Sequence, residues 1–259
     1  MKFIVEDSKD FCKALEDIQG KGKYLGLSSL TNSKVGSEFF MELKDNNLEL
    51  WNGDTTFALN ISYSVNGETD GSFTGDSDKL ISYMKKFEGE CTIEVGDSLQ
   101  ITCGSKKATT PCLVNHANIS AIQRIKEMTS HVKFEAIPET LWNFASKKFE
   151  GCFQLPSESF SNCMGLCELV KTGVYKLDYK GNDDDGKLEL SSRDSISNSY
   201  VEEMQPLHSL GEPATLEYSG PLHKFFNKTI VNFYVRDEFP LMLVGHDRKL
   251  IKAPYTRGE

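Results

Sequence analysis

The clearest alternation of hydrophobic and polar positions lies near the end of the chain, in residues 231–255. Apolar and polar side chains alternate through 231–235, and a second apolar run follows at 241–244. Turn-forming residues stand after each run, at 236–238 and 245–247. Alternation with a period of two, interrupted by turn residues, is typical of antiparallel strands with one buried face. The stretch therefore predicts a three-stranded β-meander.

The same order of elements is predicted once in each half of the chain. A helix over 77–87 precedes three strands that end at Leu113, and a helix over 219–228 precedes the final meander. Apolar residues at helical spacing support the first of these helices. A helix followed by three strands, present twice, indicates a duplicated unit.

Each half also begins with a strand and a helix. In the first half a strand over 2–6 leads to a helix that Asp7 or Ser8 can cap, and in the second half a strand over 151–155 leads to a helix over 157–171. Further strands are predicted at 24–30, 38–43, 47–51, 55–63, 174–180, 187–192, 196–204 and 214–218, and a polar loop at 66–71.

Antiparallel sheets with two helices in each half predict an α+β fold. We expect two similar domains, 1–114 and 149–259, joined by a connector at 115–148. A chain of 259 residues, of which 39% are hydrophobic, is long enough for two cores.

Charge and cysteine content limit the partners and the cellular compartment that we expect for the protein. A net charge of −9 argues against a chain that coats nucleic acid with its whole surface, although a local basic strip remains compatible with it. Seven cysteines without metal-type spacing fit a reducing compartment, and Cys163 and Cys167 are predicted to be core residues. The sequence shows no signal peptide and no run of apolar residues long enough for a membrane span, so we expect an intracellular protein without a membrane partner.

The sequence carries no motif that predicts catalysis. It lacks a nucleophile elbow, a phosphate-binding loop, a zinc-protease motif and a dinucleotide-binding turn, and its five histidines lie far apart. The acidic run 183–185 lies between two glycines and predicts a solvated hairpin tip, not a metal site. We therefore expect no enzymatic activity, no metal and no cofactor.

Lysines on the predicted helices are the best candidate binding groups. They lie on helix faces opposite the apolar stripes, where they would attract backbone phosphates without reading bases if the helices shared one surface. Ordinary solvated helix faces are the alternative interpretation. The candidates are Lys9, Lys13, Lys79, Lys85, Lys86, Lys224 and Lys228.

Several short segments of the second half together point to a known family. They are Leu155-Pro156-Ser157-Glu158-Ser159-Phe160, Glu212-Pro213-Ala214-Thr215-Leu216, Lys224-Phe225-Phe226-Asn227-Lys228, Phe239-Pro240-Leu241-Met242-Leu243-Val244 and Lys252-Ala253-Pro254. In this order they resemble the second half of the DNA polymerase sliding clamps of the PCNA and phage type. The resemblance covers most of the chain as architecture, but its motifs are specific only over roughly the last hundred residues.

The resemblance implies a replication processivity factor. Such clamps are rings of six similar domains, so a two-domain chain would form a homotrimer, with helices lining the hole and sheets forming the outer wall. The ring would encircle double-stranded DNA without sequence preference and tether DNA polymerase, and a clamp loader would place it on DNA. The edge strands that join neighbouring subunits would lie near 106–113 and 174–180.

The resemblance also implies a hydrophobic pocket for partner peptides, beneath the connector. Carried over to this sequence, the pocket would be formed by Trp51, Leu59, Ile119, Ile122, Pro240, Ile251, Ala253 and Pro254. Four features depart from the family pattern. The third predicted helix carries Asn162 and Gly165 where relatives tend to have basic residues, and the connector is longer than usual. The first half has additional chain around 24–44, and the tail 256–259 has no acidic run. These features fit a divergent clamp of viral or phage type.

Three other functions stay open on the sequence alone. The chain could be one subunit of a hetero-oligomeric checkpoint or repair ring, an enzyme on a duplicated α+β scaffold, or a peptide-binding scaffold with no role on DNA. As a clamp it would act with replicating DNA, in the cytoplasm or nucleoid of a prokaryotic or phage-infected cell, or in a eukaryotic nucleus.

Overall fold

The computed structural model describes residues 1–19, 38–53, 56–112, 119–134, 139–182, 186–194 and 198–255. The chain divides into two compact units. The first takes the described residues up to Arg124 except Thr56 and Phe57, and the second takes those two and everything from Ile125 onwards.

The first unit is built from antiparallel strands in two groups. One is a five-stranded sheet in the order β5-β1-β7-β8-β9, and the other has four neighbouring strands in the order β4-β3-β2-β6. The strands are β1 (Lys2–Val5), β2 (Glu38–Lys44), β3 (Asn47–Gly53), β4 (Phe57–Ser64), β5 (Asn66–Thr69), β6 (Gly71–Asp76), β7 (Cys91–Val95), β8 (Ser98–Cys103) and β9 (Lys106–Pro111).

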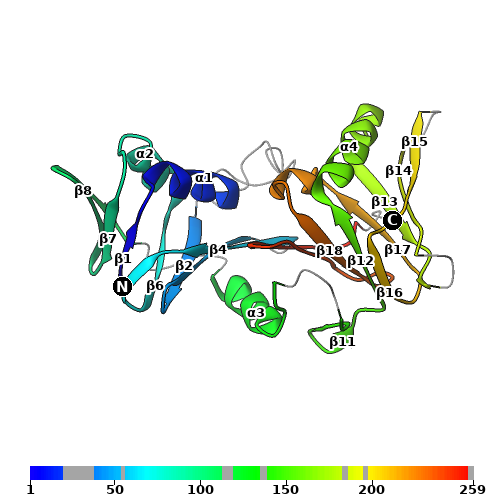
Figure 1. The fold of residues 1–259 in the computed structure, drawn as a ribbon, viewed down its shortest axis with the longest axis horizontal. Helices are drawn as coiled ribbons and strands as arrows, with labels where there is room; N and C mark the ends of the chain where they lie inside the picture. The colour runs from blue at the N-terminus through cyan, green and yellow to red at the C-terminus, as the bar shows by residue number, and fades with distance from the viewer. Residues whose placement is uncertain are drawn as a thin grey trace. The chain divides into compact units, whose positions relative to one another are not determined.

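Helices α1 (Ser8–Gln19) and α2 (Ser77–Met84) lie side by side in this unit (Figure 1). The apolar face of α1 is buried, with the Phe11 ring 6.2 Å from Phe3 and 5.4 Å from Tyr63. A third helix, α3 (Ile119–Thr129), falls within the predicted connector. The amphipathic pattern at 8–19 thus forms the helix that it predicts, and tertiary burial of that apolar face stabilises it.

The second unit also contains two antiparallel groups of strands. Five strands are ordered β16-β12-β18-β19-β20, and a separate four-stranded sheet is ordered β15-β14-β13-β17. The strands are β12 (Gly151–Pro156), β13 (Val174–Tyr179), β14 (Leu188–Arg193), β15 (Ser199–Met204), β16 (His208–Gly211), β17 (Ala214–Ser219), β18 (Ile230–Val235), β19 (Leu241–Val244) and β20 (Arg248–Lys252), with a small hairpin of β10 (Asn143–Phe144) and β11 (Lys147–Lys148).

In the described part of this unit, helix α4 (Ser157–Cys167) and the 3-10 turns η3 (Glu168–Val170) and η5 (Leu222–Phe225) pack beside one another and against the strands. Helix α4 continues into η3, and η5 packs beside α4. Phe160 of α4 meets Phe233 of β18 edge to face at 4.9 Å, and Phe233 stacks on Phe153 of β12 at 4.8 Å. These aromatic rings fasten the helix to the sheet, because edge-to-face and stacked pairs are both favourable ring geometries.

The predicted α+β class and the final meander are confirmed. Strands β18, β19 and β20 pair in sequence, with Phe233 opposite Leu243 and Leu243 opposite Leu250. The helical segment made by α4 and η3 ends at Val170, next to the predicted end at 171, because Lys171 has a left-handed backbone (φ 61°) before Gly173 (φ 66°).

The predicted helix over 219–228 is wrong in extent. Residue 219 still belongs to β17, and only the 3-10 turn Leu222–Phe225 follows. Gly220 has φ 93°, and Pro221 has backbone angles of φ −81° and ψ 66°, so neither residue has the helical conformation with which a regular helix could begin earlier. Buried Arg248 donates a hydrogen bond to the Phe225 carbonyl oxygen at 2.9 Å, which takes the acceptor that a longer helix would use.

Two predictions about strands are also wrong. Residues 66–71 are not a loop, because β5 pairs with β1 and β6 pairs with β2. Strand β13, in the predicted edge region 174–180, is not an edge strand, because it pairs with β14 on one side and β17 on the other. The strand predicted at 24–30 and the acidic turn 183–185 lie outside the described residues.

Candidate nucleic-acid interface

Five of the predicted lysines lie on the helix face of the first unit. The helices are positioned by local caps: Asp7 Oδ1 accepts from the Lys9 N–H at 2.8 Å, and Asp76 accepts from the N–H groups of Asp78 and Lys79. Such caps satisfy N–H groups that have no partner within the helix. The lysines Lys9, Lys13, Lys79, Lys85 and Lys86 are all exposed, while the opposite helix faces are buried.

Direct contacts hold α1 against α2. Gln19 Nε2 donates to Ser77 Oγ at 2.9 Å and to Asp78 Oδ1 at 2.6 Å. An ion pair joins Lys85 Nζ to Glu16 Oε1 at 2.6 Å. This carboxylate raises the pKa of Lys85. The two helices therefore present their lysines on one connected surface of this unit.

The helix face of the second unit is poor in cations. Helix α4 contains no lysine or arginine, and its exposed positions include Glu158 and Asn162. Lys224 on η5 and Lys228 after it are both exposed, and Lys224 Nζ is bound to Glu168 Oε1 at 2.9 Å. The cationic candidates are thus concentrated on the first unit, as Asn162 and Gly165 in the sequence already indicated.

The part of the predicted peptide pocket that falls in the first unit is mostly buried. Trp51, Leu59 and Ile122 are at most 2% exposed, and Trp51 Nε1 donates to Glu49 Oε2 at 2.9 Å. Ile119 remains half-buried at the start of α3. In this conformation the first three side chains are core residues.

The predicted pocket residues that lie in the second unit are more accessible than those in the first. Pro240, Ala253 and Pro254 are half-buried, whereas Ile251 is buried within β20. Leu241 pairs with Lys252, so Pro240 and Ala253 lie next to each other at the ends of neighbouring strands. The Ala253 N–H is bound to the Thr56 carbonyl oxygen at 2.8 Å, which fixes the course of the chain after β20. The pocket as a whole stays a prediction.

An aromatic cluster next to Pro240 was missed in the sequence. Phe239 lies 5.9 Å from Phe144 and 5.5 Å from Phe149, and Phe149 lies 5.8 Å from Tyr234. Trp142 Nε1 donates to the Tyr234 hydroxyl at 3.1 Å. The aromatic residues of Leu141-Trp142-Asn143-Phe144 were the available signal. They attach this part of the predicted connector to β18 of the second unit.

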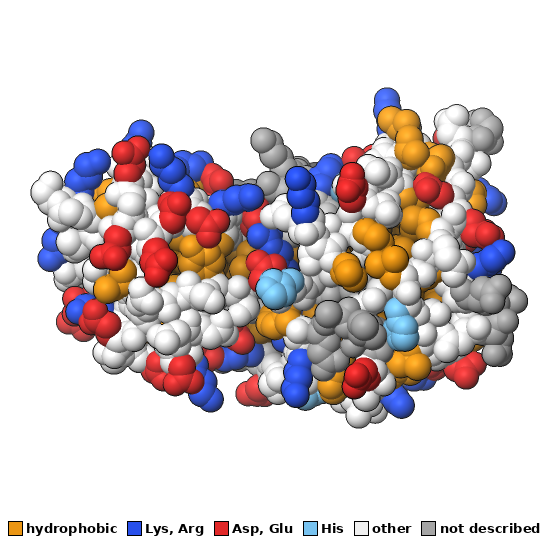
Figure 2. Space-filling model, viewed as in Figure 1, with side chains coloured by type: hydrophobic (Ala, Val, Ile, Leu, Met, Phe, Trp, Pro, Cys, Tyr) orange, Lys and Arg blue, Asp and Glu red, His pale blue; other side chains and the backbone are white. Residues whose placement is uncertain are grey.

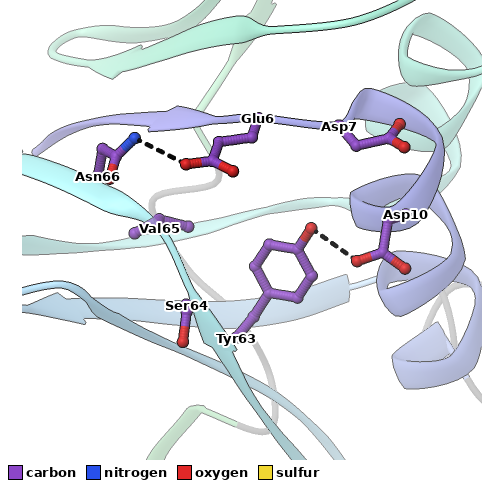
Figure 3. Close-up of a pocket in the computed structure, with 7 residues that line it drawn as sticks. All are labelled: Glu6, Asp7, Asp10, Tyr63, Ser64, Val65 and Asn66. Carbon is purple, nitrogen blue, oxygen red and sulfur yellow. Dashed lines mark hydrogen bonds between the residues drawn. The ribbon is translucent and has the colours of Figure 1, made fainter.

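A separate polar cavity of about 240 Å³ lies at the start of α1. Figure 3 shows Tyr63 of β4 pointing toward Asp10 of α1, whose Oδ2 accepts from the Tyr63 hydroxyl at 3.0 Å. Burial, the hydrogen bond to Asp10 and the nearby carboxylates raise the pKa of Tyr63. Because Glu6, Asp7 and Asp10 would repel phosphate, we do not include this cavity in the candidate interface.

Neither histidines nor cysteines form a catalytic or metal cluster in the described residues. His131, His208 and His246 are exposed and His223 is buried, while His116 lies outside those residues. The predicted core role of Cys163 and Cys167 is confirmed, since both are fully buried. Across the described ranges, no group of three or more histidine, cysteine, aspartate or glutamate side chains is arranged to hold a metal ion.

Comparison with solved structures identifies the fold. The chain matches an A. fulgidus PCNA bound to the C-terminal region of FEN-1, with a TM-score of 0.67 and 14% identity, over 100% of this chain and 99% of that one. It also matches the β subunit of DNA polymerase III from Thermotoga maritima, with a TM-score of 0.73 and 13% identity, over 100% of this chain and 66% of that one. A Helicobacter pylori β clamp bound to a DNA ligase peptide matches with a TM-score of 0.71 and 12% identity, over 100% of this chain and 68% of that one.

The chain therefore has the fold of the DNA sliding clamps, and the predicted resemblance is confirmed at the level of the fold. It spans about two thirds of the length of the bacterial β clamps but nearly the whole PCNA chain. No protein-family model matches the sequence, and no curated protein matches it. In the part of the chain that the structure describes, no helix combines the length and apolar character needed to cross a membrane.

Proposed function

We propose that this protein is a DNA sliding clamp, a processivity factor without catalytic activity of its own. The observation that carries the proposal is the match of the whole chain to PCNA over 99% of the PCNA chain. Exposed lysines on the helices of a chain with net charge −9 support it. A ring that encloses DNA is retained topologically, so weak and sequence-independent phosphate contacts suffice.

The assembly we propose is a homotrimer that encircles double-stranded DNA. Strand β9 ends the sheet of the first unit and carries Lys106 and Lys107, while strand β15 ends a sheet of the second unit and carries Glu202 and Glu203. Edge strands with opposite charges suit head-to-tail pairing between copies, which would also cover exposed backbone groups.

DNA polymerase, a clamp loader and other DNA-processing enzymes are the proposed partners, and replicating DNA is the proposed location. Two neighbours with this fold were solved with a FEN-1 segment and a DNA ligase peptide. In this chain we propose the half-buried residues Pro240, Ala253 and Pro254 of the second unit as accessible anchors for such a peptide, and Ile119 of the first unit as a separate accessible candidate. Trp51, Leu59, Ile122 and Ile251 would contribute only if binding opened the local packing.

A hetero-oligomeric ring is the second candidate. A PCNA2–PCNA3 complex from Sulfolobus tokodaii matches this chain with a TM-score of 0.64 and 15% identity, over 98% of this chain and 99% of that one. This chain would then supply only some of the subunits, in a checkpoint or repair clamp.

Solution mass combined with DNA loading tests the proposal. Light scattering of the purified chain at several concentrations should give a species of three chains. That species should remain on closed circular DNA and leave when the circle is cut, because retention is topological. A monomer at every concentration would favour the hetero-oligomeric ring. A trimer lost equally from closed and cut DNA would contradict a sliding clamp.

A further inference from the structure

On the first unit, two lysines of the candidate interface are bound by glutamates of the same surface. Lys85 Nζ lies 2.6 Å from Glu16 Oε1, and Lys9 Nζ lies 3.6 Å from Glu88 Oε1. The partners are far apart in sequence, since α1 supplies one residue of each pair and the end of α2 or the segment after it supplies the other. Figure 2 shows acidic and basic side chains interspersed over these helices. The surface is therefore a set of ion pairs, not a uniformly positive strip.

Among the described residues of the second unit, the same arrangement occurs at Lys224. Lys224 Nζ of η5 donates to both carboxylate oxygens of Glu168, at 2.9 and 3.2 Å. The two side chains are 38% and 32% exposed, so this pair is shielded from water more than Lys9–Glu88, at 74% and 79%. Shielding strengthens an ion pair, because water and salt screen it less.

We propose that Glu16, Glu88 and Glu168 limit the strength of DNA binding by competing with backbone phosphates for these lysines. This inference rests on the proposed function. A phosphate that approaches Lys85 or Lys224 must share the ammonium with a carboxylate, and the displaced carboxylate remains nearby and repels the phosphate. The effect at each exposed pair is modest, a factor of about five or less in an equilibrium constant.

Competition has a characteristic dependence on salt. A free lysine that contacts a phosphate releases counterions from DNA, so affinity falls steeply as salt rises. A lysine that is already neutralised adds less positive charge to the interface, and it contributes less to that slope. The paired surface therefore holds DNA weakly and with a shallow salt dependence, which suits a ring that must slide.

Removing the three carboxylates tests this inference directly. The variant Glu16→Gln/Glu88→Gln/Glu168→Gln keeps side-chain size and frees the lysines. Binding of the full chain to a short labelled duplex, followed by fluorescence anisotropy over a salt series, should become about three- to tenfold tighter at low salt. The slope of log affinity against log salt should also become steeper.

A matched triple variant controls for net charge. Glu68, Glu94 and Glu150 lie in β5, in β7 and just before β12, and Glu68 and Glu150 are also ion-paired. Replacing these three with glutamine, in the control triple variant, changes the net charge by the same amount at positions outside the helices, and should leave DNA affinity near that of the wild type. Thermal unfolding and solution mass confirm that both variants keep the fold and assembly.

A second control tests whether the increase in DNA affinity depends on the lysine itself. The tightening caused by Glu168→Gln should disappear when Lys224→Gln is added, because no ammonium is then released. Suppose that the wild type binds DNA but Glu16→Gln/Glu88→Gln/Glu168→Gln, the helix-face triple, binds no more tightly than the control triple variant. The inference is then overturned and the proposed function stands. If neither the wild type nor the helix-face triple binds or encircles DNA, both are overturned.

Discussion

At the residue scale, the sequence predicted which lysines are exposed but not which are neutralised. The spacing of apolar residues in α1 and α2 determines the buried face, so the exposure of Lys13 and Lys79 follows from helical periodicity alone. The pairing of Lys85 with Glu16 depends on how two distant helices pack, which local periodicity does not contain. The same holds for Trp51, which was predicted to line the peptide pocket and is nearly fully buried.

Buried His223 makes a prediction about pH. Its ring is 3% exposed and meets Phe160 edge to face at 6.1 Å, and Nδ1 has no hydrogen-bond partner among the described residues. Burial lowers the pKa of His223 to about 4, from 6.5. The unfolded chain therefore binds a proton between these values that the folded chain excludes, and this site makes stability fall as pH falls from about 6.5 to 4.

The variant His223→Leu checks this prediction, because it places an apolar side chain of similar size at this buried site and removes the group that titrates. Urea unfolding at a series of pH values should show a weaker loss of stability for the variant below pH 6.5. Each unit of pKa difference corresponds to about 1.4 kcal/mol. Replacing exposed His246 with glutamine is the control and should leave the profile unchanged. A His223→Leu profile parallel to that of the wild type would refute the assignment.

At the scale of elements, strands with strong alternation were predicted well and elements fixed by distant contacts were not. The meander of β18–β20 follows from its own pattern and turns. Polar strand β5 lacks alternation, and only its pairing with β1 makes it a strand. The edge position of β15, like the interior position of β13, depends on the order of strands in the sheet, which alternation within one strand cannot reveal.

Arg248 of strand β20 contacts the 3-10 turn η5, and replacing it should lower the free energy of unfolding strongly. Arg248 of β20 donates to the Phe225 carbonyl oxygen at 2.9 Å, and its guanidinium lies 5.5 Å from the centre of the Phe225 ring. Arg248→Met should lower the free energy of unfolding by about 2 kcal/mol, because a buried carbonyl and a cation–π contact both lose their partner. Urea denaturation measures this change.

Arg236 offers a matched control for Arg248. It also contacts a backbone carbonyl, a carboxylate and a phenylalanine ring, through Lys148, Glu150 and Phe239. Its side chain is 30% exposed, however, against 9% for Arg248. Because water can replace its contacts, Arg236→Met should cost clearly less. Equal losses for the two variants would show that the buried contact to η5 has no special weight.

At the scale of the whole molecule, the sequence motifs of the second half predicted a fold that the complete chain adopts. The charge pattern adds a feature that motifs alone did not predict. Cations concentrate on the helices of the first unit, and α4 of the second unit has none. In a ring of identical copies, regions rich and poor in phosphate contacts would alternate, so DNA would be held at intervals and not uniformly.

The proposed ring can be tested through the opposite charges of its edge strands. Lys107 lies in β9, and Glu203 lies in β15 with its carboxylate 3.2 Å from Lys187. If β9 of one copy meets β15 of the next, Lys107→Glu alone should weaken the trimer by about tenfold, because like charges then face each other at every interface. Light scattering over a concentration series measures the loss.

Charge reversal at both edges separates an interface effect from a general one. The double variant Lys107→Glu/Glu203→Lys restores opposite charges at each interface and should recover much of the wild-type assembly. Lys44→Glu is the control, because Lys44 is exposed at the end of β2, which belongs to a different sheet from β9 and from β15. Failure of the double variant to recover assembly, or an equal loss from Lys44→Glu, would place the contact between copies on another surface. The trimer and the pairing of β9 with β15 are thus tested separately, since a trimer could persist while this edge contact is ruled out.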